Sequence, residues 1–432
     1  MFEKLFQLQA HGTTARKEVI AGITTFLTMA YIIVVNPSIL SATGMDFGAV
    51  FVATCLAAAI GTLIMGLWAN YPIALAPGMG LNAFFSFTVV GSMGYSWQVA
   101  LGAVFLSGVL FFLLSILRVR EWIINSIPMS LRFGISAGIG FFLALIALKN
   151  AGVVVDHPAT LVGLGDIKTP EALLFFGGFV LICALSFRQI TGSVMIGIIA
   201  VTLAAMALGL VEFQGLVSAP PSLAPTFMQL DIAGALNVGI ISVIFAFLFV
   251  DLFDTSGTLI GAAHKGGLLD KDGKLPRLGR ALMSDSVATM SGAALGTSTT
   301  TSYVESTAGI AAGGRTGLTA VVVALLFLAC LVLSPLASVI PAYATAPALL
   351  YVAVLMASGL KQIEWDDITE SAPALITALA MPLTFSIANG IALGFITYAI
   401  LKALAGRWSQ LNASVALIAV LFILKFIFLD AA

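Results

Sequence analysis

Charged residues are scarce in this sequence. Of its 432 residues, 60% are hydrophobic and only 9% are charged, whereas a soluble domain carries about 25% charged residues. So few charges cannot cover a water-facing surface, so we expect lipid to surround most of the exterior. The net charge of −1 also argues against nucleic acid as a partner, because nucleic-acid-binding surfaces are basic.

Residues for metal, disulfide or hydrolytic chemistry are also few. Cys55, Cys183 and Cys330 lie far apart inside apolar runs, so they predict neither a metal site nor a disulfide framework. The three histidines lie in terminal or loop regions, and neither HExxH nor Gly-x-Ser-x-Gly occurs. We therefore expect no cofactor, no metal and no enzyme activity. The first residues have no signal-peptide stretch and resemble a short amphipathic helix on the membrane surface, with apolar Phe2, Leu5, Phe6 and Leu8.

Apolar segments of spanning length recur along the chain. Each approaches the ~20 residues that cross about 30 Å of hydrocarbon. Two further segments, 73–90 and 298–315, are apolar but interrupted. We expect an all-α polytopic membrane protein with about fourteen transmembrane segments and one last hydrophobic segment. The uninterrupted segments are 18–40, 49–69, 96–117, 131–149, 172–187, 190–211, 236–262, 279–296, 317–337, 343–360, 370–385, 387–404 and 411–428.

Loop charges and internal similarity give the topology. Lys and Arg gather in alternate loops, such as 265–280, whereas the loop 212–235 has none. The positive-inside rule then predicts a cytoplasmic N-terminus in the cell (inner) membrane. The stretch from Ile127 resembles the one from Ile340. Seven segments in each half would invert the second copy, as in many secondary transporters. Chance similarity between Gly/Ala-rich helices is the alternative.

The two interrupted segments break at matching places in the halves. Pro72 and Pro77 remove backbone donors, so the chain should be extended until about Pro77, where a short helix starts. The hydroxyl-rich run 296–302 also favours extended chain followed by a helix. Non-helical backbone within a membrane requires protein or a wet cavity. We expect two half-helices that point at one central site; two ordinary kinks are the alternative.

Four acidic residues lie within or beside these apolar segments: Asp251, Asp254, Asp285 and Glu305. An ionised carboxylate at a helix centre costs about 2.5–3.5 kcal/mol, so the four should face the protein interior, where such acids are usually functional. Asp251, Asp254 and Thr258 share one helix face. Structural pairing inside the bundle is the alternative for each acid.

These acids limit the ligand. A carboxylate accepts hydrogen bonds or takes a proton, and no Lys or Arg lies deep in a segment near them to receive an anion. The site therefore favours a cation or a ligand rich in N–H donors, and half-helix N-termini offer donors to its acceptors. A flat heterocycle with donors and acceptors meets these demands, because nearby rings favour stacking, although rings are also common packing residues. These rings are Phe84, Phe85, Phe87, Phe253 and Tyr303.

Five strings resemble the AzgA-like purine permeases of the nucleobase–ascorbate transporter superfamily: TTARKEVIAGITTFLTMAYIIVVNPSIL, APGMGLNAFF, FVDLFDTSGTL, ALMSDS and GTSTTTSYVESTAG. The resemblance extends essentially end to end. It implies a 7+7 inverted repeat with core and gate domains, short strands before half-helices in segments 3 and 10, and a homodimer as in relatives of this fold. The implied parts are an N-terminal segment 1–17, core 18–120 and 230–340, and gate 121–215 and 341–432.

The resemblance also implies site residues. Asp254, with Asp251 one turn earlier, and Glu305 match the substrate-binding carboxylates. Asn82 matches an important asparagine of segment 3, and Asp285 matches the segment-nine aspartate. A histidine common in uracil and xanthine relatives is replaced here by a threonine. The Asp/Glu pair favours adenine, guanine or hypoxanthine. The threonine at the histidine position is Thr25.

We therefore expect a transporter that couples purine uptake to protons. Asp254 and Glu305 would accept purine N–H groups, while Asn82 and the backbone near Gly80 and Tyr303 would orient the ring. The proton would be carried by Glu305 or Asp251, with Asp285 as a further candidate. An anion exchanger of the same architecture is one alternative, although it needs a fixed cation near the half-helices. A sodium-coupled nucleobase or cation transporter is another, because carboxylates also bind cations.

Overall fold

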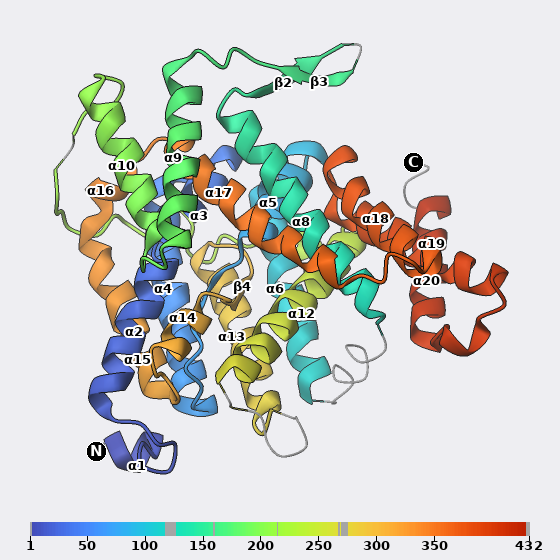
Figure 1. Ribbon diagram of the computed structural model, residues 1–432, viewed down its shortest axis with the longest axis horizontal. Coiled ribbons are helices and arrows are strands. Elements are labelled where there is room, and N and C mark those ends of the chain that lie inside the picture. The colour runs from blue at the N-terminus through green and yellow to red at the C-terminus, as the bar shows by residue number, and fades with distance from the viewer. Residues whose placement is uncertain are drawn as a thin grey trace.

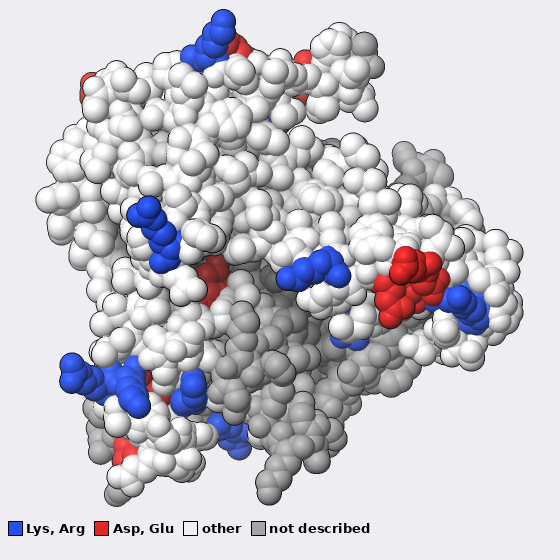
Figure 2. All heavy atoms as spheres, in the orientation of Figure 1, with Lys and Arg blue, Asp and Glu red and all other residues white. Residues whose placement is uncertain are grey.

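The computed structural model describes residues 2–116, 127–158, 160–213, 215–266, 268 and 275–428. Within this described part, eight helices are long and apolar enough to cross a membrane, and shorter apolar helices accompany them. On the face shown in Figure 2, charged side chains form separate patches and most of the described surface is uncharged. The protein is a polytopic, mainly α-helical membrane protein, as the composition predicted.

The order of the elements follows the predicted segments, with two differences. Segment 1 is divided into two helices, and segment 11 ends in a short 3-10 turn and a second helix. The first half contains α1 (Phe2–Phe6), α2 (Ala15–Met29), α3 (Ile32–Leu40), η1 (Ser41–Thr43), α4 (Phe47–Ile64), η2 (Met65–Ala69), β1 (Leu75–Pro77), α5 (Met79–Ala83), η3 (Phe84–Ser92), α6 (Trp97–Ile116), α8 (Met129–Asn150), β2 (Val154–His157), β3 (Leu161–Leu164), α9 (Pro170–Phe187) and α10 (Ser193–Ala207).

The second half repeats this progression of long helices around one short strand, an order consistent with a 7+7 arrangement. It contains α11 (Ile232–Ala235), α12 (Val238–Gly266), α13 (Leu278–Leu295), β4 (Thr300–Ser302), α14 (Ser306–Ala311), α15 (Gly317–Ala329), η4 (Cys330–Leu333), α16 (Ser334–Ser338), α17 (Ala342–Ala357), η5 (Ser358–Gln362), α18 (Ile368–Leu383), α19 (Ile387–Leu404), η6 (Trp408–Gln410) and α20 (Ala413–Phe428).

The two interrupted segments meet as an antiparallel strand pair in the middle of the helices (Figure 1). Leu75 faces Ser302 and Pro77 faces Thr300. Each strand runs directly into a helix, α5 or α14, so the pair is the crossing of two half-helices. The first half-helix begins at Met79 and not at Pro77 as predicted, because Pro77 belongs to the strand and Gly78 is the N-cap with extended backbone.

The long helices pack in two groups on either side of this crossing. One group combines α2, α4, α6, α13 and α15, and the other combines α8, α9, α17, α18 and α19. α5 and α12 pack with the first group and α10 with the second, and the groups touch at α5 against α8, α12 against α19, α2 against α10 and α3 against α17. The strand crossing belongs to the first group, where β1 packs on α4 and β4 packs on α13.

The N-terminal segment packs on the start of α15. Phe6 and Leu8 are buried against Leu318 at the start of α15. The backbone carbonyl of Phe6 also accepts a hydrogen bond from Asn70 Nδ2, at 3.3 Å. Leu5 remains half exposed. Phe6 and Leu8, two of the predicted apolar residues, therefore cover the start of α15.

Candidate functional site

Glu305 lies where β4 gives way to α14, as the N-cap residue of that half-helix. Its carboxylate is half-buried, and Oε1 accepts a hydrogen bond from Tyr31 Oη at 2.5 Å. Tyr31 occupies the interruption between α2 and α3 and is 1% exposed. Sequence reasoning missed Tyr31, because an aromatic residue inside an apolar run carries no signal of a partner 274 positions away.

Tyr303 connects the two breaks. Its hydroxyl donates to the backbone carbonyl of Pro77 at 2.6 Å, and its backbone N–H donates to Ala74 at 2.9 Å. The side chain is buried. Tyr303 therefore lies at the crossing as predicted, and its hydroxyl supports the backbone of the opposite break.

Two asparagines hold consecutive residues of the second break. Asn82, in α5, is fully buried, and its Oδ1 accepts a hydrogen bond from Ser298. Its Nδ2 has no partner among the residues that the structure describes. Asn36, in α3, donates through Nδ2 to Thr297 Oγ1 at 2.8 Å and to Thr54 Oγ1 at 2.7 Å. Asn82 was predicted from the family resemblance, whereas Asn36 was missed because it is an uncharged amide outside the two breaks.

Asp251 and Asp285 come together behind β4. Both are almost fully buried. Thr255 Oγ1, one turn after Asp251, lies 2.9 Å from Asp285 Oδ1 and 3.3 Å from Asp251 Oδ1. Ser302 Oγ donates to Asp285 at 3.3 Å, and Thr289 Oγ1 donates to Asp251 at 3.4 Å. The two carboxylates thus share one hydroxyl, next to the strand crossing.

Three other predicted residues, Asp254, Thr25 and Gly80, do not join these clusters in the part of the chain that the structure describes. The backbone of Asp254 belongs to α12, but its side chain and that of Phe253 lie outside the described residues. Thr25 is fully buried in α2, where a Cβ at Gly309 would overlap its Oγ1. Gly80 faces the second helix group, because a Cβ there would lie 2.5 Å from Ile139 Cγ2.

The rings after the first break mostly pack inside the protein. Phe84 and Phe85 are fully buried, and Phe84 meets Phe247 edge to face at 5.0 Å between ring centroids. Phe87 meets Phe385 of the second group at 6.4 Å. These contacts show that Phe84 and Phe85 are packing residues of the helix bundle, while Phe87 contributes to the contact between the groups.

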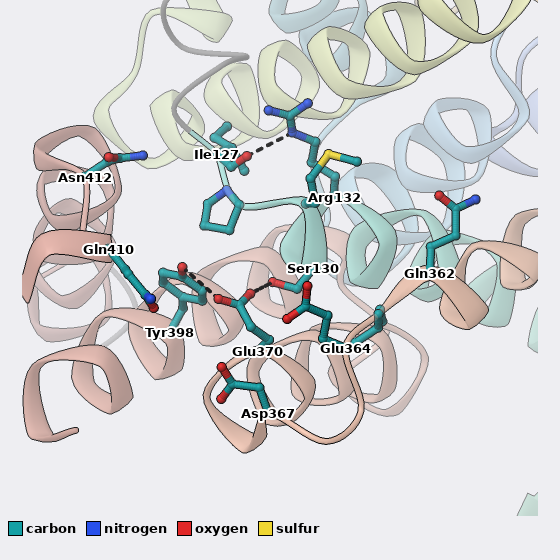
Figure 3. A pocket seen from close by; sticks show the side chains of 13 residues that line it. Ile127, Ser130, Arg132, Gln362, Glu364, Asp367, Glu370, Tyr398, Gln410 and Asn412 are labelled. Atoms are coloured by element: carbon teal, nitrogen blue, oxygen red, sulfur yellow. Dashed lines mark hydrogen bonds between the residues drawn. The ribbon is translucent and has the colours of Figure 1, made fainter. Parts of the chain in front are cut away.

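A separate polar cluster lies at one end of the second group, beside a cavity of about 470 Å³ (Figure 3). Glu370 Oε1 pairs with Lys402 Nζ at 2.7 Å and accepts from Tyr398 Oη at 3.2 Å. Glu370 Oε2 accepts from Ser130. Lys402 is 0% exposed and belongs to the last turn of α19. The cluster ties α8, α18 and α19 together.

An exposed ion pair adjoins this cluster. Asp367, the N-cap of α18, accepts hydrogen bonds from Thr369 and forms an ion pair with Arg407. These contacts lower the pKa of Asp367 to about 2. Asp367 is therefore ionised at every pH near neutrality, and this site has no proton to exchange under physiological conditions.

A multi-pass bundle with two half-helices crossing inside it, next to buried carboxylates, is the architecture of a transporter. Residues 16–393 match the Permease family (Xan_ur_permease), and the chain belongs to that family, which confirms the resemblance seen in the sequence. The protein is therefore a transporter and not an enzyme.

Several relatives and solved structures are similar to the chain. It is 54% identical over 431 residues to adenine permease AdeP of Escherichia coli K12, covering 100% of this chain and 97% of the relative. It is 47% identical to guanine/hypoxanthine permease PbuG of Bacillus subtilis 168, covering 98% and 99%. The transmembrane domain of the cyanobacterial bicarbonate transporter BicA superposes with a TM-score of 0.65 at 15% identity, over 88% and 96%, which shows a shared fold.

Proposed function

We propose that this chain is a secondary active transporter that takes up purine nucleobases: adenine, guanine or hypoxanthine. The observation that carries the proposal is the 54% identity, along the whole chain, to a relative named as an adenine permease. The guanine/hypoxanthine relative at 47% identity extends the substrate class to other purines. Because similar relatives are named for adenine and for guanine and hypoxanthine, we propose the purine ring as the common substrate feature. The uptake experiment determines which purine is preferred.

The substrate site in this proposal is the crossing of the half-helices. Asp254 and Glu305 accept purine N–H groups, because an ionised carboxylate accepts hydrogen bonds and donates none. Asn82 and the backbone near Gly80 and Tyr303 meet the ring acceptors. The Asn82 Nδ2 that lacks a partner in the described part of the chain supports this role. Thr25, the last of the predicted site residues, packs against Gly309 of α14 and supports that half-helix.

Proton coupling is proposed at the buried acids. Asp251 and Asp285 share the Thr255 hydroxyl, so their charges lie close together, and a proton on the pair would offset their repulsion. Glu305 is the third candidate, because it joins the substrate site. Sodium coupling is the alternative, since two carboxylates and hydroxyl oxygens also suit a monovalent cation.

Movement of one helix group against the other would carry the site across the membrane. We propose a core of 18–120 and 230–340 and a gate of 121–215 and 341–432, with an N-terminal segment 1–17. The two packing groups support this division. The contact of Phe87 with Phe385 and the 3.0 Å hydrogen bond from Thr88 Oγ1 to the Phe385 carbonyl would break in the motion. A cytoplasmic N-terminus, the inner membrane and a homodimer belong to the same proposal.

The test is uptake of radiolabelled adenine, guanine and hypoxanthine by cells that express the protein. Asp254→Ala and Glu305→Ala should each lower uptake at least tenfold at normal expression, whereas Glu364→Ala, which removes an exposed acid of the gate, should not. Wild-type rates in both site variants would refute the site assignment.

The coupling ion and the competing anion exchanger are separated in the same cells. A protonophore should abolish accumulation, and sodium-free buffer should leave it unchanged. The opposite pattern would favour sodium coupling. Exchange of inorganic anions without purine uptake would support the anion exchanger instead.

A further inference from the structure

We propose that Tyr31 is a positioning residue for purine specificity: it holds one oxygen of Glu305 so that the other receives a single N–H of the ligand. This inference rests on the proposed function. Tyr31 Oη donates to Glu305 Oε1 at 2.5 Å. A phenol hydroxyl bonded to a carboxylate is among the stronger hydrogen bonds, because the acceptor is charged. The bond fixes the rotation of the carboxylate, which an otherwise flexible side chain would not maintain.

The surroundings explain why this contact is rigid. Tyr31 lies in the two-residue gap between α2 and α3, and its ring is 1% exposed. Thr28 Oγ1, one turn earlier, lies 3.5 Å from the backbone carbonyl of Glu305. The first segment thus contacts both the side chain and the backbone carbonyl of Glu305, although Glu305 lies far away in the sequence.

The other carboxylate oxygen, Oε2, determines which hydrogen-bond donor the ligand must present. Among the described side chains, Tyr31 alone donates a hydrogen bond to the Glu305 carboxylate, and that bond ends on Oε1. With one acceptor position of Oε1 taken by Tyr31 and the carboxylate held in one rotation, Glu305 favours a single N–H at Oε2 over a bidentate pair. A purine that presents a single N–H at this point fits. A ligand with its N–H groups replaced by methyl groups loses the bond and leaves a half-buried carboxylate poorly solvated.

Tyr31→Phe removes only the hydroxyl and tests this directly. We expect KM and the dissociation constant for purine to rise about tenfold, the loss expected for one hydrogen bond to a charged group, with the maximal rate per transporter within about twofold. Discrimination against an N-methylated purine should fall in parallel. Tyr71→Phe is the matched control: its hydroxyl, also buried, accepts from the Arg277 backbone at 3.1 Å, and its loss should leave KM unchanged.

A double-mutant cycle shows whether Tyr31 acts through Glu305. In purified protein, Tyr31→Phe should weaken purine binding tenfold in the wild-type background and less than about twofold in Glu305→Gln, because coupled residues are non-additive. Tyr31→His keeps a ring donor and should restore much of the affinity. If Tyr31→Phe fails to fold, Tyr31→Met, which also lacks a donor, takes its place. Equal effects in both backgrounds, or wild-type affinity in Tyr31→Phe, overturn the inference alone. Absence of purine binding by the wild-type protein overturns the proposed function as well.

Discussion

At the scale of single residues, Lys402 depends on its partners because it is a fully buried charge of the second helix group. It is 0% exposed and depends on Glu370, at 2.7 Å, and on Gln410, at 2.8 Å. A buried charge that loses its partner is strongly destabilising. Lys402→Met leaves Glu370 inside without its cation, so we expect the free energy of unfolding to fall by about 3 kcal/mol. Thermal unfolding of the detergent-purified protein measures it.

Two further variants separate the ion pair from general damage to the gate. Lys402→Met combined with Glu370→Met should regain part of the loss, because replacing both partners of a buried pair with apolar groups is often nearly neutral. Arg407→Met breaks the exposed pair with Asp367 and should change stability little. Equal losses in Arg407→Met and Lys402→Met would contradict the buried-charge argument.

Among the acids, burial was predictable only where a carboxylate interrupts an apolar segment. Asp251 and Asp285 stand in the middle of apolar segments, where a carboxylate is too costly to be accidental, and they do meet. Glu370 and Lys402 lie near segment ends, where charges are normal, so nothing predicted the burial of Lys402 or its pairing with the half-buried Glu370. Glu18 was missed for the same reason, although it is fully buried and accepts from the backbone of Arg315.

At the scale of elements, the half-helix α14 is held by a close contact with α2. A Cβ at Gly309 would overlap Thr25 Oγ1 and lie 2.5 Å from the Ala21 carbonyl. Gly309→Ala must therefore push the half-helix, with Glu305 at its start, away from α2. We expect a loss of about 1–3 kcal/mol in stability, as for other overpacked sites, and reduced uptake.

Gly177→Ala provides the control, because a Cβ at that helical position meets nothing within 4 Å. Thr25→Ala should partly rescue Gly309→Ala by removing the nearer atom, which also tests what Thr25 does. If Gly309→Ala matched Gly177→Ala in melting temperature and in uptake, the close packing of α14 on α2 would not matter to the site.

The elements themselves were largely predictable, but their pairing was not. Prolines and a hydroxyl-rich run predicted two breaks, because each removes or competes with helical hydrogen bonds. That the breaks pair with each other, with Leu75 opposite Ser302, depends on two segments more than 200 residues apart. The start of α5 at Met79 depended on this pairing too, because it kept Pro77 in the strand.

At the scale of the whole molecule, the proposed motion requires that the two helix groups separate and close again at the crossing. At Gly80 the half-helix α5 packs tightly on α8, since a Cβ there would lie 2.5 Å from Ile139 Cγ2. That atom is a branch of a stiff side chain and cannot move far. Gly80→Ala should therefore wedge the groups apart and lower the rate of uptake about tenfold, with protein expression unchanged.

Gly80 also belongs to the proposed substrate site, so the variant alone does not distinguish a wedge from a damaged binding surface. Ile139→Leu moves the branch away from the Gly80 contact at nearly constant volume, which cores tolerate well. If the contact between groups limits the motion, Ile139→Leu alone transports normally and restores the rate of Gly80→Ala. If the rate stays low while purine affinity also falls, the methyl group acts on the ligand, and the closing contact between core and gate must lie elsewhere, with Phe87 and Phe385 as the next pair to vary.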